Sequence, residues 1–219
     1  MKRNTISKKK RKLKPKIKIA FTLLVCAIIS CIVVFFPNIK EAYKQAQRIK
    51  TLSSVELPSW ITENIIDIHG SARTGNKLKK LNNIVVHYVG NPNTTAAENR
   101  DYFNNSATEV SSHFVVGLEG EIIQCLPLNE ISAASNHRNI DTISIEVCHP
   151  DESGRFNELT YSSLTKLLSW LCSILDMSAE DIIRHYDVTG KLCPIYYVEN
   201  PQEWDALITD VRLQIDAIG

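Results

Sequence analysis

The chain has 219 residues, 44% of them hydrophobic, and a formal net charge of +1. That size suits one ordinary domain with an appendage, and the sequence holds no internal repeat. The near-neutral total hides an asymmetry: residues 1–18 carry ten Lys/Arg and no acid, which leaves 25 − 10 = 15 basic against 24 acidic residues elsewhere, a net of −9. A basic arm can bind nucleic acid, but this one adjoins an uncharged apolar run. The pattern therefore favours a membrane, and we expect no nucleic-acid partner.

The apolar run covers residues 19–36 (IAFTLLVCAIISCIVVFF), 18 residues that are just long enough to cross the hydrocarbon core as a helix. Because the upstream charge is positive, the positive-inside rule puts the N-terminus in the cytoplasm. A cleaved signal peptide is the alternative, but the run exceeds a usual signal core and no small-residue cleavage site follows it. We therefore expect a basic cytoplasmic arm over 1–18 and an N-terminal transmembrane helix over 19–36 that anchors the chain in the lipid bilayer.

The next segment, residues 37–57, is polar and partly helical in composition, and it predicts a stalk or linker. The sequence becomes more apolar at Pro58-Ser59-Trp60-Ile61. We therefore expect the folded domain to cover 58–219.

Short β-rich runs and helical patterns alternate in the first half of this domain. Residues 84–88 (IVVHY) are typical of a buried strand. Residues 95–98 (TAAE) form a capping box, which predicts a helix through about Asn104. Residues 112–116 and 122–126 are strand-like and separated by a Gly-containing turn, so they predict a hairpin.

The second half continues the alternation. Residues 142–147 (TISIEV) place Glu146 on the polar face of a strand. Apolar side chains at helical spacing from Tyr161 to Leu175 predict an amphipathic helix, residues 182–185 fit a short strand or a turn, and Asn200-Pro201 opens a last helix. This order predicts an α/β or α+β domain with a mixed central β-sheet flanked by helices.

The six cysteines do not form the pattern of a disulfide framework. Two lie in the apolar run, and four are spread through the domain: Cys125, Cys148, Cys172 and Cys193. Buried cysteines commonly act as small hydrophobes. A bridge between two of the first three stays open, because connectivity cannot be read from a sequence.

Three residues have the chemistry of a metal site. His185 and Cys193 lie eight residues apart in a Gly-containing loop, and His87 ends an apolar strand. Two nitrogens and one sulfur leave one tetrahedral position open for water, which is the pattern of a catalytic zinc site. Taken alone, His87 is more often a core residue than a ligand and Cys193 is more often buried and inert, so the spacing by itself is only suggestive.

The order His87 … His185-x5-Lys191-x-Cys193 resembles the zinc-dependent N-acetylmuramoyl-L-alanine amidases of the type-2 amidase group. That group includes phage lysozyme amidases, peptidoglycan recognition proteins and cytoplasmic recycling amidases. The resemblance runs from about Pro58 to the end of the chain and includes four flanking segments: 84–92 (IVVHYVGNP), 111–124 (SSHFVVGLEGEIIQ), 142–150 (TISIEVCHP) and 183–194 (IRHYDVTGKLCP).

The resemblance implies a Zn2+ held by His87, His185 and Cys193. It also implies hydrolysis of the amide between N-acetylmuramic acid and L-alanine in peptidoglycan. Glu146 matches the strand glutamate of the recycling-type amidases, and we expect it to deprotonate water and then protonate the leaving amine. Lys191 matches the basic residue two places before the last ligand, and we expect it to stabilise the oxyanion.

One departure concerns the phage lysozymes, which carry a catalytic tyrosine just before a His-Phe-like pair. Ser112 stands there in this chain, before His113-Phe114, so the Glu146-dependent variant is favoured. Asn136 and Arg138 are candidates to hold carboxylates or amides of the peptide stem. His113 is expected to support the hairpin or the outer side of a metal ligand.

Two alternative functions stay open. A non-catalytic peptidoglycan-binding module is one, although such modules often lack the cysteine ligand. A cysteine hydrolase with Cys193 as nucleophile and His185 as base is the other, but it leaves His87 and Lys191 unexplained. The expected location is the bacterial cell membrane, single-pass, with the catalytic domain extracytoplasmic.

Overall fold

The computed structural model describes residues 15–218 and divides the chain into two compact units, Met1–Tyr43 and Lys44–Gly219. Helix α1 (Pro15–Leu52) begins in the first unit and ends in the second. Among the described residues, no helix combines the length and the apolar character that crossing a bilayer requires. Most side chains of the predicted anchor, 19–36, and most of the predicted arm, 1–18, lie outside the described part of the chain, so both assignments stay predictions.

The second unit begins earlier than the sequence predicted. Leu52 is buried in the apolar core, and Arg48 is only 5% exposed. The Arg48 guanidinium donates hydrogen bonds to the carbonyl oxygens of Leu81, Leu175 and Asp176 at 2.9–3.0 Å. The predicted stalk over 37–57 therefore overlaps the compact unit from Lys44 onward, because Arg48 and Leu52 are buried in that unit.

The core of the second unit is a mixed sheet of six strands within the described residues, in the order β1-β4-β3-β5-β2-β6. Only β3 and β4 pair antiparallel; the other neighbours are parallel. The strands are β1 (Ile61–Glu63), β2 (Asn83–Tyr88), β3 (Phe114–Val116), β4 (Ile122–Gln124), β5 (Thr142–Val147) and β6 (Ile182–Arg184). The predicted mixed α/β fold is confirmed.

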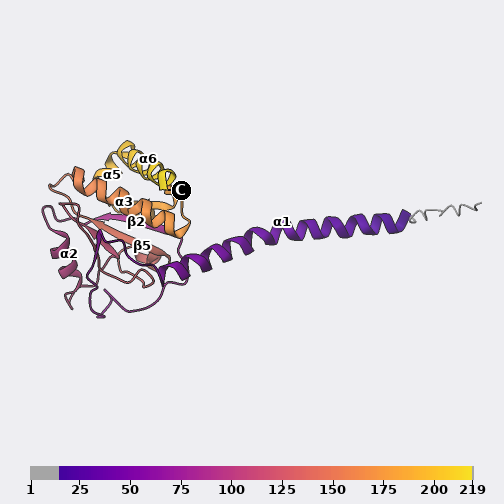
Figure 1. Ribbon diagram of the computed structural model, residues 1–219, viewed down its shortest axis with the longest axis horizontal. Helices are drawn as coiled ribbons and strands as arrows, with labels where there is room; N and C mark the ends of the chain where they lie inside the picture. The colour runs from indigo at the N-terminus through magenta and orange to yellow at the C-terminus, as the bar shows by residue number, and fades with distance from the viewer. Residues whose placement is uncertain (1–14, 219) are drawn as a thin grey trace, which may run out of the picture. The chain divides into compact units, whose positions relative to one another are not determined.

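Strand alternation divides the side chains between two faces of the sheet. Helices α3 (Glu158–Leu175) and α6 (Pro201–Ile218) lie side by side over one face (Figure 1). Their buried side chains pack against alternate strand residues in one apolar cluster, which includes Ile84, Val86, Ile143, Ile145, Leu164, Leu168 and Leu207. The other face carries α2 (Ala96–Phe103) and a smaller cluster with Phe103 and Val115. One face is thus closed by apolar helices, and the other is free to hold a site.

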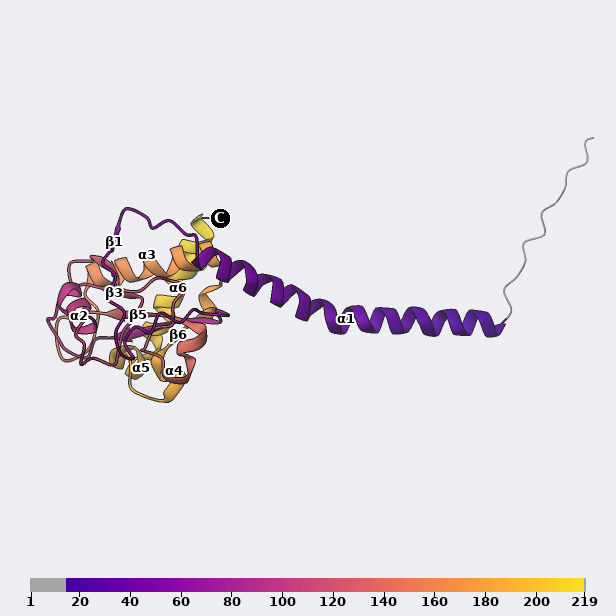
Figure 2. The ribbon, with the colours of Figure 1, turned by 90° about the horizontal axis from the view of Figure 1, so that it is seen from below.

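Several local signals agree with the structure. Thr95 caps α2 through the predicted capping box, and β5 has the predicted bounds. Four short elements escaped prediction because they are too brief to show a period: strand β1, the 3-10 helix η1 (Asn136–Asp141), and helices α4 (His185–Thr189) and α5 (Ile195–Glu199). A second 3-10 helix, η2 (Ala179–Asp181), follows the predicted cap at Ser178. Helix α4 follows β6 directly and lies beside it (Figure 2).

Candidate metal centre

Strands β2 and β6 bring the two histidines together. Val86 pairs with Arg184 in the parallel register, so His87 on β2 and His185, the residue that follows β6, are the next residues of the two chain segments. Both side chains are buried, at 2% and 6% exposure, and their ring centroids lie 4.6 Å apart. His185 is also the first residue of α4, so the change from strand to helix fixes the position of its backbone.

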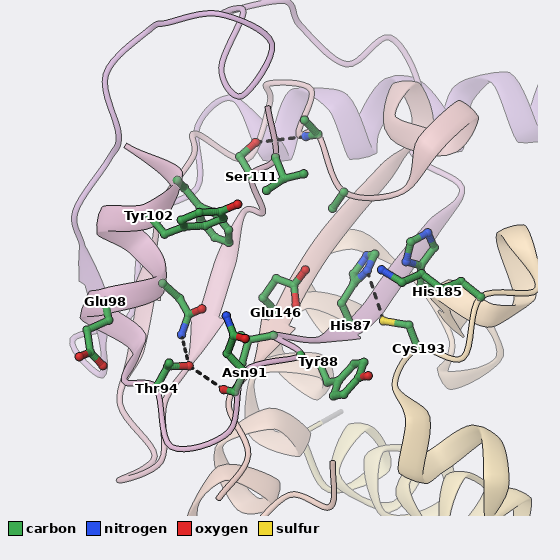
Figure 3. A pocket seen from close by; sticks show the side chains of 18 residues that line it. His87, Tyr88, Asn91, Thr94, Glu98, Tyr102, Ser111, Glu146, His185 and Cys193 are labelled. Atoms are coloured by element: carbon green, nitrogen blue, oxygen red, sulfur yellow. Dashed lines mark hydrogen bonds between the residues drawn. The ribbon is translucent and has the colours of Figure 1, made fainter. Parts of the chain in front are cut away.

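Cys193 reaches the same point through the turn after α4. Gly190 ends this helix with φ +78°, a left-handed conformation that glycine adopts without steric cost. The chain then folds back, and the Tyr186 amide donates to the Cys193 carbonyl at 2.9 Å. Cys193 Sγ lies 3.9 Å from His87 Nδ1 (Figure 3). One ligand atom from each of His87, His185 and Cys193 lies within 4.8 Å of the other two.

Burial and charge set the protonation of this cluster. Burial lowers the pKa of His87 well below its usual value, and the nearby His185 and Lys191 lower it further. Burial, followed by Lys191, also lowers the pKa of His185. Burial raises the pKa of the Cys193 thiol to about 12, and Glu146 adds to the rise. Both imidazoles are therefore neutral and able to offer lone pairs, whereas the thiol needs a bound cation to lose its proton.

Glu146 lies on β5 directly opposite His87 in the parallel register, so both side chains emerge on the α2 face of the sheet. Burial raises the pKa of Glu146 to about 8, against an opposing effect from Lys191. Its Oε2 is buried and has no hydrogen-bond partner among the described residues. An unsatisfied carboxylate oxygen beside an N/N/S cluster fits a site that receives a cation and a polar substrate.

These side chains line an open cavity of about 410 Å³. Glu146, His87 and Cys193 form one side, and α2 forms another with Tyr102 and Glu98 (Figure 3). A second hollow of about 760 Å³ shares five residues with the first: Val110, Ala133, Ala134, His185 and Lys191. The cluster therefore lies where two parts of one groove meet. The contribution of α2 could not be predicted, because it depends on how the helix packs across the sheet.

Asn136 and Arg138, the two residues expected from the sequence to hold the peptide stem, both make hydrogen bonds within the fold. Arg138 does not line either hollow; its guanidinium donates to Asp141 Oδ1 at 2.8 Å and to Asn83 Oδ1 at 2.6 Å. The role of Arg138 at the peptide stem stays a prediction, and two of its guanidinium nitrogens already bind Asp141 and Asn83 within the fold. Asn136 lines the second hollow, but its Oδ1 lies 2.8 Å from His185 Nε2. Ser135 Oγ lies 3.3 Å from His87 Nε2.

His113 and the cysteines have structural positions. His113 is fully buried, and its Nε2 lies 2.9 Å from the Glu130 carbonyl oxygen, so it connects the β3–β4 hairpin with the following loop as predicted. The hydrogen-bond partners of its ring nitrogens are Ser144 and the Glu130 carbonyl oxygen, and neither is one of the clustered histidines. The four cysteines of the domain are free, so the open question of a disulfide among Cys125, Cys148 and Cys172 is answered: there is none.

The fold and the groove define a class: a mixed α/β domain with a two-histidine, one-cysteine cluster and a partly buried glutamate in an open cleft. The family model described as N-acetylmuramoyl-L-alanine amidase matches residues 77–195, more than half of the chain and including all of these residues. The chain belongs to this type-2 family of N-acetylmuramoyl-L-alanine amidases.

Similar proteins agree with this family. The chain is 27% identical over 175 residues to the N-acetylmuramoyl-L-alanine amidase CwlL of Bacillus licheniformis, covering 72% of this chain and 47% of CwlL. It is 29% identical over 167 residues to BlyA of Bacillus subtilis (strain 168), covering 67% of this chain and 45% of BlyA. The solved structure of a mutant endolysin from Bacillus subtilis has a TM-score of 0.61 at 27% identity, covering 69% of this chain and 97% of that one. The chain spans about half the length of the curated relatives it matches.

Proposed function

We propose that the chain hydrolyses the amide bond between N-acetylmuramic acid and L-alanine in peptidoglycan, with a zinc ion held by His87, His185 and Cys193. The observation that carries the proposal is the convergence of three ligand atoms within 4.8 Å in a groove that also holds Glu146 and Lys191. The names of CwlL and BlyA, both N-acetylmuramoyl-L-alanine amidases, support the bond that is cut.

The residues fit zinc by donor chemistry, since two neutral imidazoles and one thiol match a catalytic site with three protein ligands. Zinc bound there supplies Lewis acidity, which polarises a carbonyl and lowers the pKa of water towards about 7. The centre is open to the groove, so a substrate carbonyl can approach from solvent.

Glu146 and Lys191 have distinct proton and charge roles in this proposal. The Glu146 carboxylate takes a proton from the water that attacks the lactyl carbonyl carbon. It then delivers that proton to the L-alanine nitrogen as the carbon–nitrogen bond breaks. A carboxyl with a pKa of about 8 can both accept and donate a proton near neutral pH. Lys191 is exposed at the junction of the two hollows, and its ammonium stabilises the negative charge that develops on the carbonyl oxygen.

The two alternative functions fit the geometry less well. A cysteine hydrolase needs an accessible thiolate, whereas Cys193 is 2% exposed and its sulfur lies against His87. A non-catalytic binding module gives no reason for a buried Glu146 Oε2 without a hydrogen-bond partner beside three ligand atoms. The hydrolase proposal uses all of these residues.

Mass spectrometry of muropeptide products tests the reaction. Purified peptidoglycan treated with the full chain should yield new free L-alanine amino termini and intact glycan strands. The activity should disappear after exhaustive chelation and return with zinc. Cuts within the glycan, or between two residues of the stem, would refute the proposed bond specificity; activity that survives chelation would refute the role of zinc.

We further propose that the N-terminal segment holds the enzyme at the bacterial cell membrane, with the domain outside. The ten basic residues of 1–18 followed by the uncharged run 19–36 support this location. Fractionation of cells should find the chain in the membrane fraction, accessible to an externally added protease. A chain found in the soluble fraction would contradict the proposal.

A further inference from the structure

We propose that Ser135 and Asn136 are positioning residues that orient the two histidines of the candidate centre, one residue for each ring. This inference rests on the proposed function, because ring orientation matters to the chemistry only if His87 and His185 bind a cation. Two residues adjacent in sequence thus set both nitrogen ligands from one short loop.

The contacts place this pair on the outer side of both rings. His87 directs Nδ1 towards Cys193 Sγ at 3.9 Å, and its Nε2 lies 3.3 Å from Ser135 Oγ. His185 Nε2 lies 2.8 Å from Asn136 Oδ1. An amide oxygen can only accept, so His185 Nε2 carries the proton and Nδ1 keeps its lone pair. Each ring therefore has one nitrogen held by the loop and the other left for the centre.

The loop itself is fixed by its own hydrogen bonds. Asn139 Oδ1 accepts from the backbone amides of Ala134 at 3.1 Å and Ser135 at 2.6 Å. The Arg138 amide donates to the Ser135 carbonyl at 3.0 Å. Ser135 is fully buried, and Asn136 has φ +55°, a left-handed conformation that asparagine adopts more readily than most residues. The two side chains are thus presented by a backbone of defined shape.

The chemical consequence is control over the tautomer and the rotation of each imidazole. Without an acceptor at Asn136, the proton of neutral His185 can lie on either ring nitrogen. In the Nδ1–H tautomer, that proton occupies the position of the lone pair that a cation needs. Removal of such an outer partner typically weakens metal affinity by about 10–100-fold. The same change should leave the metal-free fold nearly unaffected, because the Asn136 side chain is exposed.

The test compares Asn136→Gly with Asn136→Asp in the full chain. Glycine keeps the left-handed backbone and removes the acceptor, whereas aspartate keeps an acceptor that cannot turn into a donor. Asn93→Gly is the matched control, since Asn93 is also exposed, has φ +62° and does not line the groove. Zinc affinity is measured by competition with a chelator, the geometry of the centre by the absorption of the Co2+-loaded protein, and the fold by thermal unfolding of the metal-free chain.

We expect Asn136→Gly to lose about 10–100-fold in zinc affinity and to change the Co2+ absorption, while Asn136→Asp and Asn93→Gly bind like the unchanged chain. Ser135→Ala should show a smaller loss, because its contact to His87 is the longer one. Equal zinc affinity in Asn136→Gly and the unchanged chain would overturn the inference and leave the proposed function intact. Unfolding of metal-free Asn136→Gly well below Asn93→Gly would also overturn it, because the role would then be structural. No zinc binding by the unchanged chain would overturn both.

Discussion

The two faces of the sheet differ in what their side chains do. On the face covered by α3 and α6, strand residues such as Val86 and Ile145 are fully buried in an apolar cluster. On the α2 face, their immediate neighbours His87 and Glu146 point into a groove. The same two strands therefore serve both faces, one residue apart. Stability and chemistry are separated by strand alternation alone, so substitutions on the two faces should have separable effects.

The largest expected effect comes from replacing a cysteine by serine, once in the metal cluster and once in the apolar cluster. Cys193→Ser should abolish zinc binding and reduce hydrolysis to the background rate, because a hydroxyl is a poor zinc ligand. Cys172→Ser, at a buried position of α3 in the apolar cluster, is the matched control and should keep both. Zinc content by elemental analysis and product mass spectrometry check the pair. Full zinc content in Cys193→Ser would break the comparison.

The second effect concerns the glutamate opposite His87. Glu146→Gln keeps the size of the side chain and removes its ability to take a proton, so kcat should fall by about 10²–10⁴-fold. Zinc content should stay unchanged, since Glu146 is not one of the clustered ligands. Glu63→Gln, on the exposed edge strand β1, is a control that should retain full turnover. Normal kcat in Glu146→Gln would show that another group acts as the base.

The third effect belongs to the apolar face. Leu168→Ala removes a fully buried side chain of α3 and should lower the free energy of unfolding by about 2–5 kcal/mol. The zinc affinity of the folded protein should stay the same, because the cavity opens on the opposite face. Chemical denaturation measures the first quantity and chelator competition the second. A large loss of affinity in this variant would show that the two faces are coupled.

The fourth effect is a pH dependence of the free energy of unfolding that arises from a histidine beside the α2 face. Burial lowers the pKa of His113 from 6.5 to about 4, so the folded state favours the neutral ring. Its contribution, on the order of 3 kcal/mol, is fully present above about pH 6.5 and is lost as the pH falls towards 4, because the unfolded chain binds the proton first. Denaturation of the metal-free chain across this range should show the loss. His113→Gln should flatten the curve; an unchanged slope would assign the acid sensitivity to other groups.

The smallest expected effect separates Arg138 from the groove. Arg138→Ala should cost about 1–3 kcal/mol of stability, because it removes one hydrogen bond to the buried Asp141 and one to Asn83, and KM for peptidoglycan should stay unchanged. Urea denaturation and steady-state kinetics measure the two quantities. A raised KM at unchanged stability would support the substrate role that the sequence suggested.

Much of the fold was predictable where the signal was local. The alternation in 142–147 defined β5 and the face of Glu146, and the capping box at Thr95 defined the start of α2. The positions that depend on distant pairing were not predictable. Strand β1 has three residues and exists through its pairing with β4, and Tyr102 reaches the groove only because α2 crosses the sheet.

The candidate centre shows the same division between local and distant signals. The resemblance pointed to His87, His185 and Cys193, and the register of β2 with β6 explains why they meet. It could not show that Asn136 faces the outer nitrogen of His185, because that contact joins residues 49 positions apart through a left-handed turn. Arg138 carried the charge expected of a substrate contact, but Asp141, three residues later, takes up that charge.

The buried Arg48 has a consequence for how the domain can be released. Its guanidinium occupies the carbonyl oxygens at the end of α3, and it belongs to the last turns of α1. A protease that clips the exposed Ser53-Ser54 link would remove this arginine and leave those acceptors bare. Separation of the intact compact unit from residues 1–43 would therefore require cleavage before Lys44, so the end of the helix belongs to the folded unit.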